Sequence, residues 1–292
     1  MRTLALPPRR AGHAPDASVL ERREGSSTRP GAYREHPDVE IKERRLGDVR
    51  CLCLTPPGHP PGTLVFAHGG AYRAGSPERL TGFTSQLAAR SGWRIISPAY
   101  GLAPEFPFPA AIHDSAAVIE ALFAETPDET IVLGGESAGA GLAATLAARF
   151  GTHVPAPRLA GAMLLSPWVD MRVSAGAYTS RAGTDQLFSL ERASDAAELY
   201  LQGVDPRDPL ASPVFADLSG MPPTQIIVGG AEVLLDDSLL LAGEIARHGV
   251  TVELHAIADM QHVSPTLFPD LACSIESFAL MEGFLRRILT NG

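Results

Sequence analysis

A single serine stands among small residues in the segment G-E-S-A-G at residues 135–139, which fits the G-x-S-x-G pattern of a nucleophile elbow. The apolar, β-branched run at 130–133 predicts a strand before it, and residues 142–149 favour a helix after it. A sharp turn between them would lift the Ser137 hydroxyl out of the sheet, and neighbours without bulk would let strand and helix pack closely. The pattern alone does not decide the chemistry, because many glycine-rich strand-to-helix turns bind phosphate or nothing.

A serine hydroxyl is a poor nucleophile near neutral pH unless a base, an acid and donors for an oxyanion surround it. The segment H-G-G-A follows a short apolar strand expected at residues 63–67 and fits an oxyanion loop, although a plain tight turn would look the same in isolation. Its occurrence together with G-x-S-x-G favours the oxyanion loop. We expect the backbone N–H groups of Gly69, Gly70 and Ala138 to be the donors, and His68 to hold the loop by hydrogen bonding.

His262 is the expected base among nine histidines. It lies in the loop after the last expected strand, residues 250–257, at the same edge of the sheet as Ser137, and it completes the chain order serine, acid, histidine. The histidines outside these two segments lie in polar or proline-rich stretches, on expected helices or within a strand, where a structural role is the simpler interpretation: His13, His36, His59, His113, His153, His248 and His255.

The acid should follow the strand expected at residues 225–228, because that strand precedes the one leading to the base. Glu232 is closest to its end and is the expected acid, with Asp236 as the alternative. Asp236 and Asp237 open the next expected helix, where carboxylates also favourably cap the helix macrodipole. We prefer that capping role for both aspartates.

The overall composition fits an ordinary globular protein of 292 residues, with a net charge of −9 that argues against nucleic-acid or anionic-membrane partners. No apolar run approaches the roughly 18–20 residues of a membrane span, and Pro7 and Pro8 interrupt any secretory signal, so a cytoplasmic location is expected. Cys51, Cys53 and Cys273 lack metal-type spacing and are expected to be reduced thiols. Neither metal nor other cofactor is expected.

Positioning these side chains requires strands that alternate with helices. Such alternation predicts a mostly parallel sheet with helices on both faces. A hairpin turning at residues 47–48 would add antiparallel strands at one edge. The eight expected strands are residues 39–46, 49–54, 63–67, 93–97, 130–133, 159–166, 225–228 and 250–257. The clearest expected helices are residues 14–23, 77–90, 110–125, 189–202, 236–247 and 275–289.

These motifs together resemble the hormone-sensitive-lipase-like (bacterial family IV) esterases of the α/β-hydrolase superfamily, from about residue 39 to the last residue. The matching segments are H-G-G-A-Y at 68–72, Y-G-L-A-P-E at 100–105, G-E-S-A-G at 135–139, S-P-W-V-D at 166–170, and His262. Three positions depart from the family pattern: Glu136 replaces the usual aspartate of the elbow, Glu232 the usual aspartate of the acid, and Gly101 a usual arginine.

The resemblance implies an α/β-hydrolase core in two parts, residues 38–170 and 221–292, with a helical cap. The cap would consist of an N-terminal arm, residues 1–37, and an insertion, residues 171–220. The resemblance also implies a carboxylesterase acting on small-molecule esters with short-to-medium acyl chains. A homodimer through the last helix, with Ile275 and Ile288, is possible on the same grounds, although packing against the core explains those residues equally well.

Two other classes of function fit parts of this pattern. An amidase, an arylformamidase-like enzyme, a lactonase or an acyl transferase would use the same catalytic groups on another acyl compound. A non-catalytic ligand receptor of the same fold is the other alternative. Such a receptor lacks a member of the triad, whereas this chain has a candidate for all three.

Overall fold

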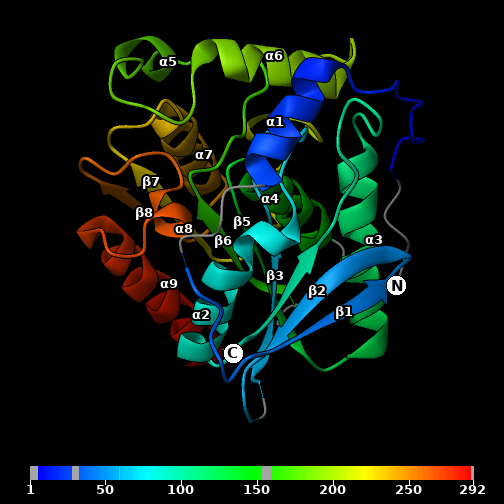
Figure 1. The fold of residues 1–292 in the computed structure, drawn as a ribbon. Helices are drawn as coiled ribbons and strands as arrows, with labels where there is room; N and C mark the ends of the chain where they lie inside the picture. The colour runs from blue at the N-terminus through cyan, green and yellow to red at the C-terminus, as the bar shows by residue number, and fades with distance from the viewer. Residues whose placement is uncertain (1–5, 28–32, 59, 153–158, 291–292) are drawn as a thin grey trace.

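The computed structural model describes residues 6–27, 33–58, 60–152 and 159–290, which form an eight-stranded sheet with helices on both faces (Figure 1). The sheet has the order β1-β2-β4-β3-β5-β6-β7-β8. The strands are β1 (Glu40–Leu46), β2 (Val49–Thr55), β3 (Gly62–Ala67), β4 (Arg94–Pro98), β5 (Thr130–Glu136), β6 (Leu159–Leu165), β7 (Thr224–Gly229) and β8 (Val252–Ile257). This architecture confirms the predicted fold class and each of the eight expected strands.

The hairpin of β1 and β2 lies at one edge of the sheet, as predicted. Its turn residues Gly47 and Asp48 have φ angles of 53° and 64°, the left-handed conformation that a tight two-residue hairpin turn requires. β2 pairs antiparallel with both β1 and β4. Every other neighbouring pair of strands is parallel, so the chain reverses direction within the sheet at this edge alone.

Because β3 and β5 to β8 run parallel, their carboxyl ends meet at one edge of the sheet, where folds of this class place their sites. The three side chains predicted to do chemistry all leave these strand ends: Ser137 follows β5, Glu232 follows β7 and His262 follows β8. His68 after β3 and Ser166 after β6 lie at the same edge.

The core has two layers, one on each face of the sheet. β3 shows how the alternation of side chains divides them, since Leu64 and Phe66 pack in one cluster and Val65 and Ala67 in the other. All six residues of β3 are buried, as expected for a parallel strand covered on both faces. Cys51 and Cys53 both point into the same cluster as Val65, and the three cysteines are free thiols.

Helices α2 (Thr81–Ser91) and α9 (Ala272–Thr290), at the lower left of Figure 1, cover one face of the sheet. The other face is covered by α3 (Ala110–Glu125), α4 (Ala138–Gly151) and α7 (Leu235–Arg247). The remaining helical elements are α1 (Ala17–Ser27), η1 (Pro77–Leu80), α5 (Ala177–Ser180), α6 (Leu190–Leu201), η2 (Pro213–Phe215) and α8 (Ser264–Leu267). In the described ranges no helix combines the length and the apolar character needed to cross a membrane.

The first helix begins later than predicted. The sequence predicted residues 14–23, whereas α1 spans Ala17–Ser27. The reason lies in Asp16, whose carboxylate accepts a hydrogen bond from the backbone N–H of Val19 at 3.0 Å and so caps the first turn.

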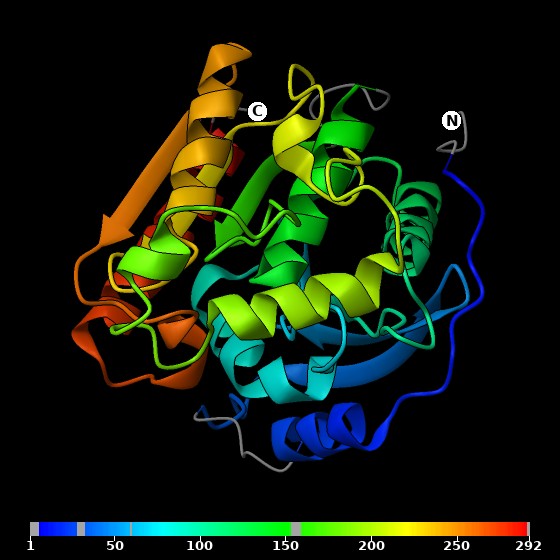
Figure 2. The ribbon, with the colours of Figure 1, turned by 90° about the horizontal axis from the view of Figure 1, so that it is seen from above.

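Helices α1 and α6 lie above the carboxyl edge of the sheet (Figure 2). Tyr200 of α6 stacks on Tyr72 after the H-G-G-A segment, with ring centroids 4.0 Å apart. Asp195 of α6 forms an ion pair with Arg73. On α1, the guanidinium of Arg23 donates to the carbonyl oxygen of Arg73 at 2.8 Å and to Glu105 Oε1 at 2.6 Å. Both helices are therefore anchored to the loop that follows β3.

Gly139 allows α4 to lie directly against the end of β3. A methyl group at this position would overlap the carbonyl oxygens of Ala67 and His68, which are backbone atoms with little freedom to move. Gly139→Ala is therefore expected to lower the free energy of unfolding by about 1–3 kcal/mol. Urea denaturation followed by circular dichroism measures this as a lower midpoint.

Gly243 of α7 is the matched control, because its added methyl group would have only Arg247 Nη1 nearby, at 3.7 Å. Gly243→Ala is expected to raise the free energy of unfolding by about 0.5–1 kcal/mol through helix propensity. Equal effects of the two substitutions would show that close packing at Gly139 does not limit stability.

Candidate active site

Ser137 sits in a strained turn between β5 and α4. Its φ of 54° and ψ of −121° are sparsely populated for a residue with a side chain, and surrounding contacts hold it there. Its N–H donates to the carbonyl oxygen of Leu165 at 2.9 Å, and its own carbonyl oxygen accepts from the N–H of Trp168 at 3.1 Å. The neighbouring strand and the segment after β6 thus hold the backbone on both sides, which leaves the hydroxyl above the sheet edge as the elbow pattern predicts.

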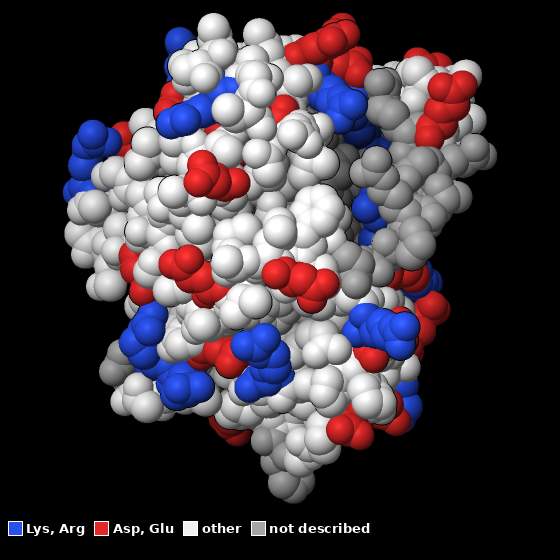
Figure 3. All heavy atoms as spheres, turned by 60° about the vertical axis from the view of Figure 1, so that its left-hand side comes forward, with Lys and Arg blue, Asp and Glu red and all other residues white. Residues whose placement is uncertain are grey.

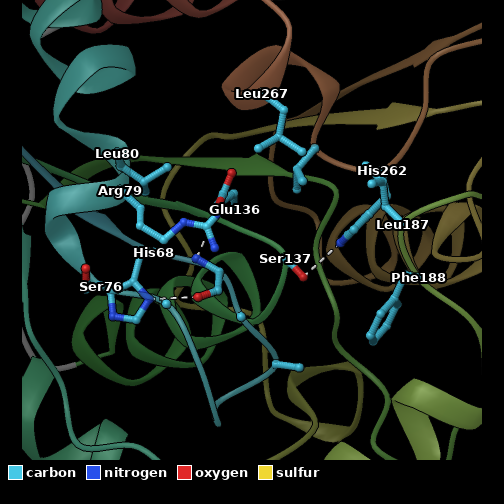
Figure 4. A pocket seen from close by; sticks show the side chains of 15 residues that line it. His68, Ser76, Arg79, Leu80, Glu136, Ser137, Leu187, Phe188, His262 and Leu267 are labelled. Carbon is cyan, nitrogen blue, oxygen red and sulfur yellow. Dashed lines mark hydrogen bonds between the residues drawn. The ribbon is translucent and has the colours of Figure 1, made fainter. Parts of the chain in front are cut away.

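The side chains of Ser137, His262 and Glu232 form one hydrogen-bonded chain. His262 Nε2 lies 3.0 Å from Ser137 Oγ, and His262 Nδ1 lies 2.5 Å from Glu232 Oε2 (Figure 4 shows the first contact). The Glu232 side chain is fully buried, and the His262 ring is buried as well. This is the arrangement in which a carboxylate orients an imidazole toward a serine hydroxyl.

The second carboxylate oxygen of Glu232 is also fixed. Oε1 accepts from the backbone N–H of Gly229 at 2.5 Å and from the hydroxyl of Ser166 at 2.8 Å. The same Ser166 oxygen accepts from the N–H of Val263, next to His262, at 3.3 Å. Ser166 was not among the predicted site residues. Its place at the end of β6, between the strands that lead to Ser137 and to Glu232, is the signal that would have pointed to it.

The preferred interpretation of Asp236 and Asp237 as helix caps holds for their position alone. Both lie in the first turn of α7, where carboxylates suit the macrodipole, but that helix has no side-chain cap hydrogen bond, and their oxygens bind backbone elsewhere. Asp236 Oδ2 accepts from the N–H of Ala177 at 2.7 Å, and Asp237 Oδ2 accepts from the N–H of Val169 at 3.0 Å. The segment after Ser166 folds back over this turn, so its backbone reaches the carboxylates that sequence alone assigns to the helix.

The H-G-G-A segment is held by His68 and Tyr100. His68 Nδ1 lies 2.7 Å from the carbonyl oxygen of Gly69, and its ring stacks on Tyr100 with centroids 4.2 Å apart. The Tyr100 hydroxyl donates to the carbonyl oxygen of His68 at 2.7 Å. Burial lowers the pKa of His68 to about 4, so its ring is neutral near neutral pH. These contacts match the loop-holding role expected of His68.

The N–H groups of this segment are not equivalent. The Gly69 N–H donates to Glu136 Oε1 at 3.3 Å, so it is already engaged by a carboxyl group. Within the described ranges, the N–H groups of Gly70 and Ala71 have no acceptor, and both residues line the same pocket as Ser137. Their φ angles of 112° and 53° are left-handed, and successive residues of this kind make a concave arrangement of backbone N–H groups.

A pocket of about 220 Å³ opens above Ser137 (Figure 4). Most of its wall is apolar, and the Phe188 ring stacks on His262 with centroids 5.4 Å apart. Ser76 and Arg79 add polar groups at one side. The other apolar side chains in the wall are Leu80, Leu187, Val263 and Leu267.

The other histidines that the structure describes do not line this pocket. His113 Nε2 lies 2.6 Å from the carbonyl oxygen of Pro7, and His248 Nδ1 lies 2.9 Å from that of Glu244. His59 and His153 lie outside the described residues. Among the residues that are described, no group of three or more His, Cys, Asp or Glu side chains has the geometry of a metal site.

Comparison with known proteins agrees with this fold. A family model described as the alpha/beta hydrolase fold matches residues 64–266. The chain belongs to this family. It is 37% identical over 232 residues to an acetyl-hydrolase of Streptomyces hygroscopicus, covering 79% of this chain and 77% of the relative. It is 34% identical over 208 residues to an esterase of Acinetobacter venetianus, covering 70% and 68% of the two chains.

Solved structures place this α/β-hydrolase more narrowly. An esterase from the bacterial hormone-sensitive lipase family superposes with a TM-score of 0.84 at 31% identity, covering 93% of this chain and 97% of the other. A hormone-sensitive lipase from a metagenome library gives a TM-score of 0.83 at 33% identity, covering 94% and 92%. The protein is therefore a carboxylesterase of the hormone-sensitive-lipase-like branch, as its motifs predicted.

Proposed function

We propose that this carboxylesterase hydrolyses esters with short-to-medium acyl chains through a Ser137–His262–Glu232 triad. The observation that carries the proposal is the continuous chain of contacts, 3.0 Å from serine to histidine and 2.5 Å from histidine to glutamate, beside an apolar pocket. Asp236, the alternative acid, is engaged with Ala177 instead.

In the first half-reaction, Ser137 Oγ attacks the acyl carbonyl carbon while His262 Nε2 takes the hydroxyl proton. Glu232 balances the positive charge that forms on the ring. The C–O bond to the alcohol then breaks, and His262 returns the proton to the leaving oxygen. Water deprotonated by His262 attacks the acyl-enzyme in the second half-reaction, which releases the acid and restores Ser137.

The tetrahedral intermediates carry a negative oxygen that needs N–H donors. From the predicted set we retain Gly70 and Ala138, the first residue of α4, where helix N–H groups have no intrahelical partner. We add Ala71, whose N–H has no acceptor in the described ranges. Gly69 has its N–H directed to Glu136, so we assign it the role of shaping the loop.

The size and lining of the pocket support the acyl preference. A volume of about 220 Å³ with an apolar wall suits a short chain better than a long one. The relative from Streptomyces hygroscopicus, which is named an acetyl-hydrolase, favours the same end of the range. Residues 1–37 and 171–220 would act as the cap, and residues 38–170 and 221–292 as the core, since α1 and α6 bind the loop after β3.

Three further expectations stay predictions. A cytoplasmic location is one, and the lack of a nucleic-acid partner is another. For the second of these, Figure 3 shows that acidic and basic side chains are interspersed over the face that carries α9. A homodimer is the third: Ile275 on α9 is 57% exposed, while Phe278 and Leu285 on the same helix are buried in the core.

A substrate panel tests the proposed activity. We expect the highest kcat/KM for p-nitrophenyl acetate, butyrate or octanoate, a fall for the palmitate, and much slower turnover of the matching p-nitroanilides and lactones. A p-nitroanilide or a lactone turned over faster than every ester would assign the amidase or lactonase alternative instead. Turnover of none of these compounds by the folded enzyme would favour a ligand receptor.

The pH dependence of kcat/KM provides a further prediction. Burial lowers the pKa of His262, but the Glu232 carboxylate raises it by its charge and its hydrogen bond, and the net pKa lies above the usual 6.5. A general base must be neutral, so activity is lost as pH falls through this raised pKa. The acidic limb of a kcat/KM profile should therefore have its midpoint above 6.5. A midpoint clearly below this value would contradict the close pairing of His262 with Glu232.

A further inference from the structure

Glu136 is a buried carboxyl group beside the nucleophile for which the mechanism above has no use. It is the last residue of β5, directly before Ser137, and only 9% of it is exposed. Its Oε1 accepts from the N–H of Gly69 at 3.3 Å, and its Oε2 lies 2.5 Å from the hydroxyl of Thr266 in α8 (Figure 4 shows Glu136 between His68 and Leu267). One side chain thus joins the loop after β3 to the helix that follows His262.

The hydrogen count at Thr266 indicates where a proton lies. Thr266 Oγ1 is 2.5 Å from Glu136 Oε2 and 2.9 Å from the carbonyl oxygen of Val263. A hydroxyl has one hydrogen, and a carbonyl oxygen and an ionised carboxylate are both acceptors only. If Glu136 is ionised, the Thr266 hydroxyl can donate to either Glu136 Oε2 or the Val263 carbonyl oxygen. The other acceptor then lies close to the Thr266 oxygen with no hydrogen between them. With Glu136 protonated, its O–H donates to Thr266, and Thr266 donates to Val263.

The surroundings of Glu136 also favour its protonated form, because their net effect is to raise its pKa. Burial is the largest effect and raises the pKa of Glu136. The hydrogen bond from Thr266, the His262 ring, the Gly69 N–H and the Arg79 guanidinium of η1 each lower it, but the net pKa stays above the usual value. Tyr100 faces Glu136 from the loop after β4, and it has a pKa well above its usual value through burial, so it stays neutral.

A negative charge at Glu136 would also oppose catalysis. A methyl group on Gly69 would stand 2.9 Å from Glu136 Oε1 and 3.2 Å from Ser137 Cβ, so these two side chains lie against the same face of Gly69. The oxyanion of the reaction forms next to Ser137, so a negative charge on the neighbouring Glu136 would repel it. Buried carboxylic acids that stay neutral to serve as hydrogen-bond donors are known in other oxyanion sites.

We propose that Glu136 is a positioning residue that works in its protonated, neutral form. Its O–H donates to Thr266 and its carbonyl oxygen accepts from Gly69, so it sets the oxyanion loop at a fixed distance from the loop that carries His262. The proposal rests on the proposed triad for its catalytic consequence, but the protonation state of Glu136 is independent of it. Deprotonation at high pH leaves Thr266 with a hydrogen for only one of its two contacts, to Glu136 or to Val263, and adds charge beside the oxyanion.

Glu136→Gln is the decisive variant, because an amide reproduces a protonated carboxyl: its nitrogen donates to Thr266 and its oxygen accepts from Gly69. We expect kcat/KM at neutral pH to stay within about threefold of the wild type, since the hydrogen bonds persist. The alkaline decline of activity caused by Glu136 should disappear, while the acidic limb set by His262 stays in place. Glu136→Ala, which lacks both contacts, should lower kcat by about tenfold, and Thr266→Val should lower it by a similar factor.

A loss of a hundredfold or more in Glu136→Gln, together with an acidic limb moved to lower pH, would overturn the proposal. That outcome would mean that an ionised Glu136 supports the charge on His262. Failure of Glu136→Gln to fold would be recognised by circular dichroism, and the infrared measurement below needs only the wild type and one folded variant. In that case Glu136→Ala, which also removes the carboxyl group, takes the place of Glu136→Gln in the infrared comparison.

Infrared difference spectroscopy tests the protonation state without any turnover. The wild-type spectrum minus that of Glu136→Gln at neutral pH should contain the carbonyl band of a protonated carboxyl group. Asp237 is a second buried carboxyl, whose pKa burial raises to about 8, so Asp237→Asn serves as the control that removes a different protonated band. A difference spectrum with only carboxylate bands would refute the proposal, whatever the outcome for Ser137 and His262.

Discussion

Ser137→Ala is expected to lower kcat for p-nitrophenyl acetate by about 10⁶-fold, the loss that removal of a triad serine causes in other hydrolases. The substitution removes the one oxygen that lies 3.0 Å from His262 Nε2. It leaves the backbone environment intact, because alanine meets the same conformational restriction as serine at a φ of 54°. Initial rates at saturating substrate measure the effect.

The control for this substitution is the fold itself. Thermal unfolding followed by circular dichroism should give nearly the same midpoint for Ser137→Ala and wild type, because the hydrogen bonds that hold the turn come from the Ser137 backbone and only the side-chain contact with His262 is lost. A folded Ser137→Ala variant that keeps more than a small fraction of wild-type activity would show that another group is the nucleophile.

Glu232→Gln is expected to lower kcat by about 10⁴-fold, as in other triads whose acid becomes an amide. Oε1 accepts from Gly229 and Ser166, so the amide oxygen takes that side, and the amide nitrogen then faces His262 Nδ1. Two donors cannot face each other, which forces the proton of His262 onto Nε2. That tautomer is unable to accept the proton of Ser137. Steady-state kinetics near the pH optimum measure this loss.

Asp236→Asn is the matched control for Glu232→Gln. Both replace a carboxylate with an amide, at positions four residues apart, but among the described residues Asp236 accepts only from the N–H of Ala177, at 2.7 Å, and an amide oxygen retains that contact. We expect kcat to change less than about threefold. If Asp236→Asn lowers activity by orders of magnitude and Glu232→Gln does not, the acid is Asp236.

The patterns in the sequence predicted the sheet well because they are local. Alternation and short apolar runs marked every strand, and the expected helix at residues 110–125 coincides with α3. Burial of β3 on both faces followed from its uninterrupted apolar run. Short helices were missed, since α5 and α8 have four residues each and their stability comes from tertiary contacts.

The candidate site was predictable where strand ends alone decide the geometry. Ser137, Glu232 and His262 each leave the carboxyl end of a parallel strand, so their convergence follows from topology. Contacts that depend on how loops fold over one another were not predictable. The bond of Ser166 to Glu232 and that of Thr266 to Glu136 join residues far apart in sequence, and no local pattern marks either pair.

The most direct test of the central claim is the covalent labelling of Ser137. The enzyme is incubated with a p-nitrophenyl alkylphosphonate, whose phosphorus a triad serine attacks with release of p-nitrophenolate, and the product is mapped by peptide mass spectrometry. The account predicts one phosphonyl group per chain, located on Ser137, with simultaneous loss of esterase activity and no labelling of Ser137→Ala. Inactivation that is accompanied by a label on a different residue would contradict it. So would a Ser137→Ala variant whose residual activity the phosphonate inactivates as fast as it inactivates the wild type.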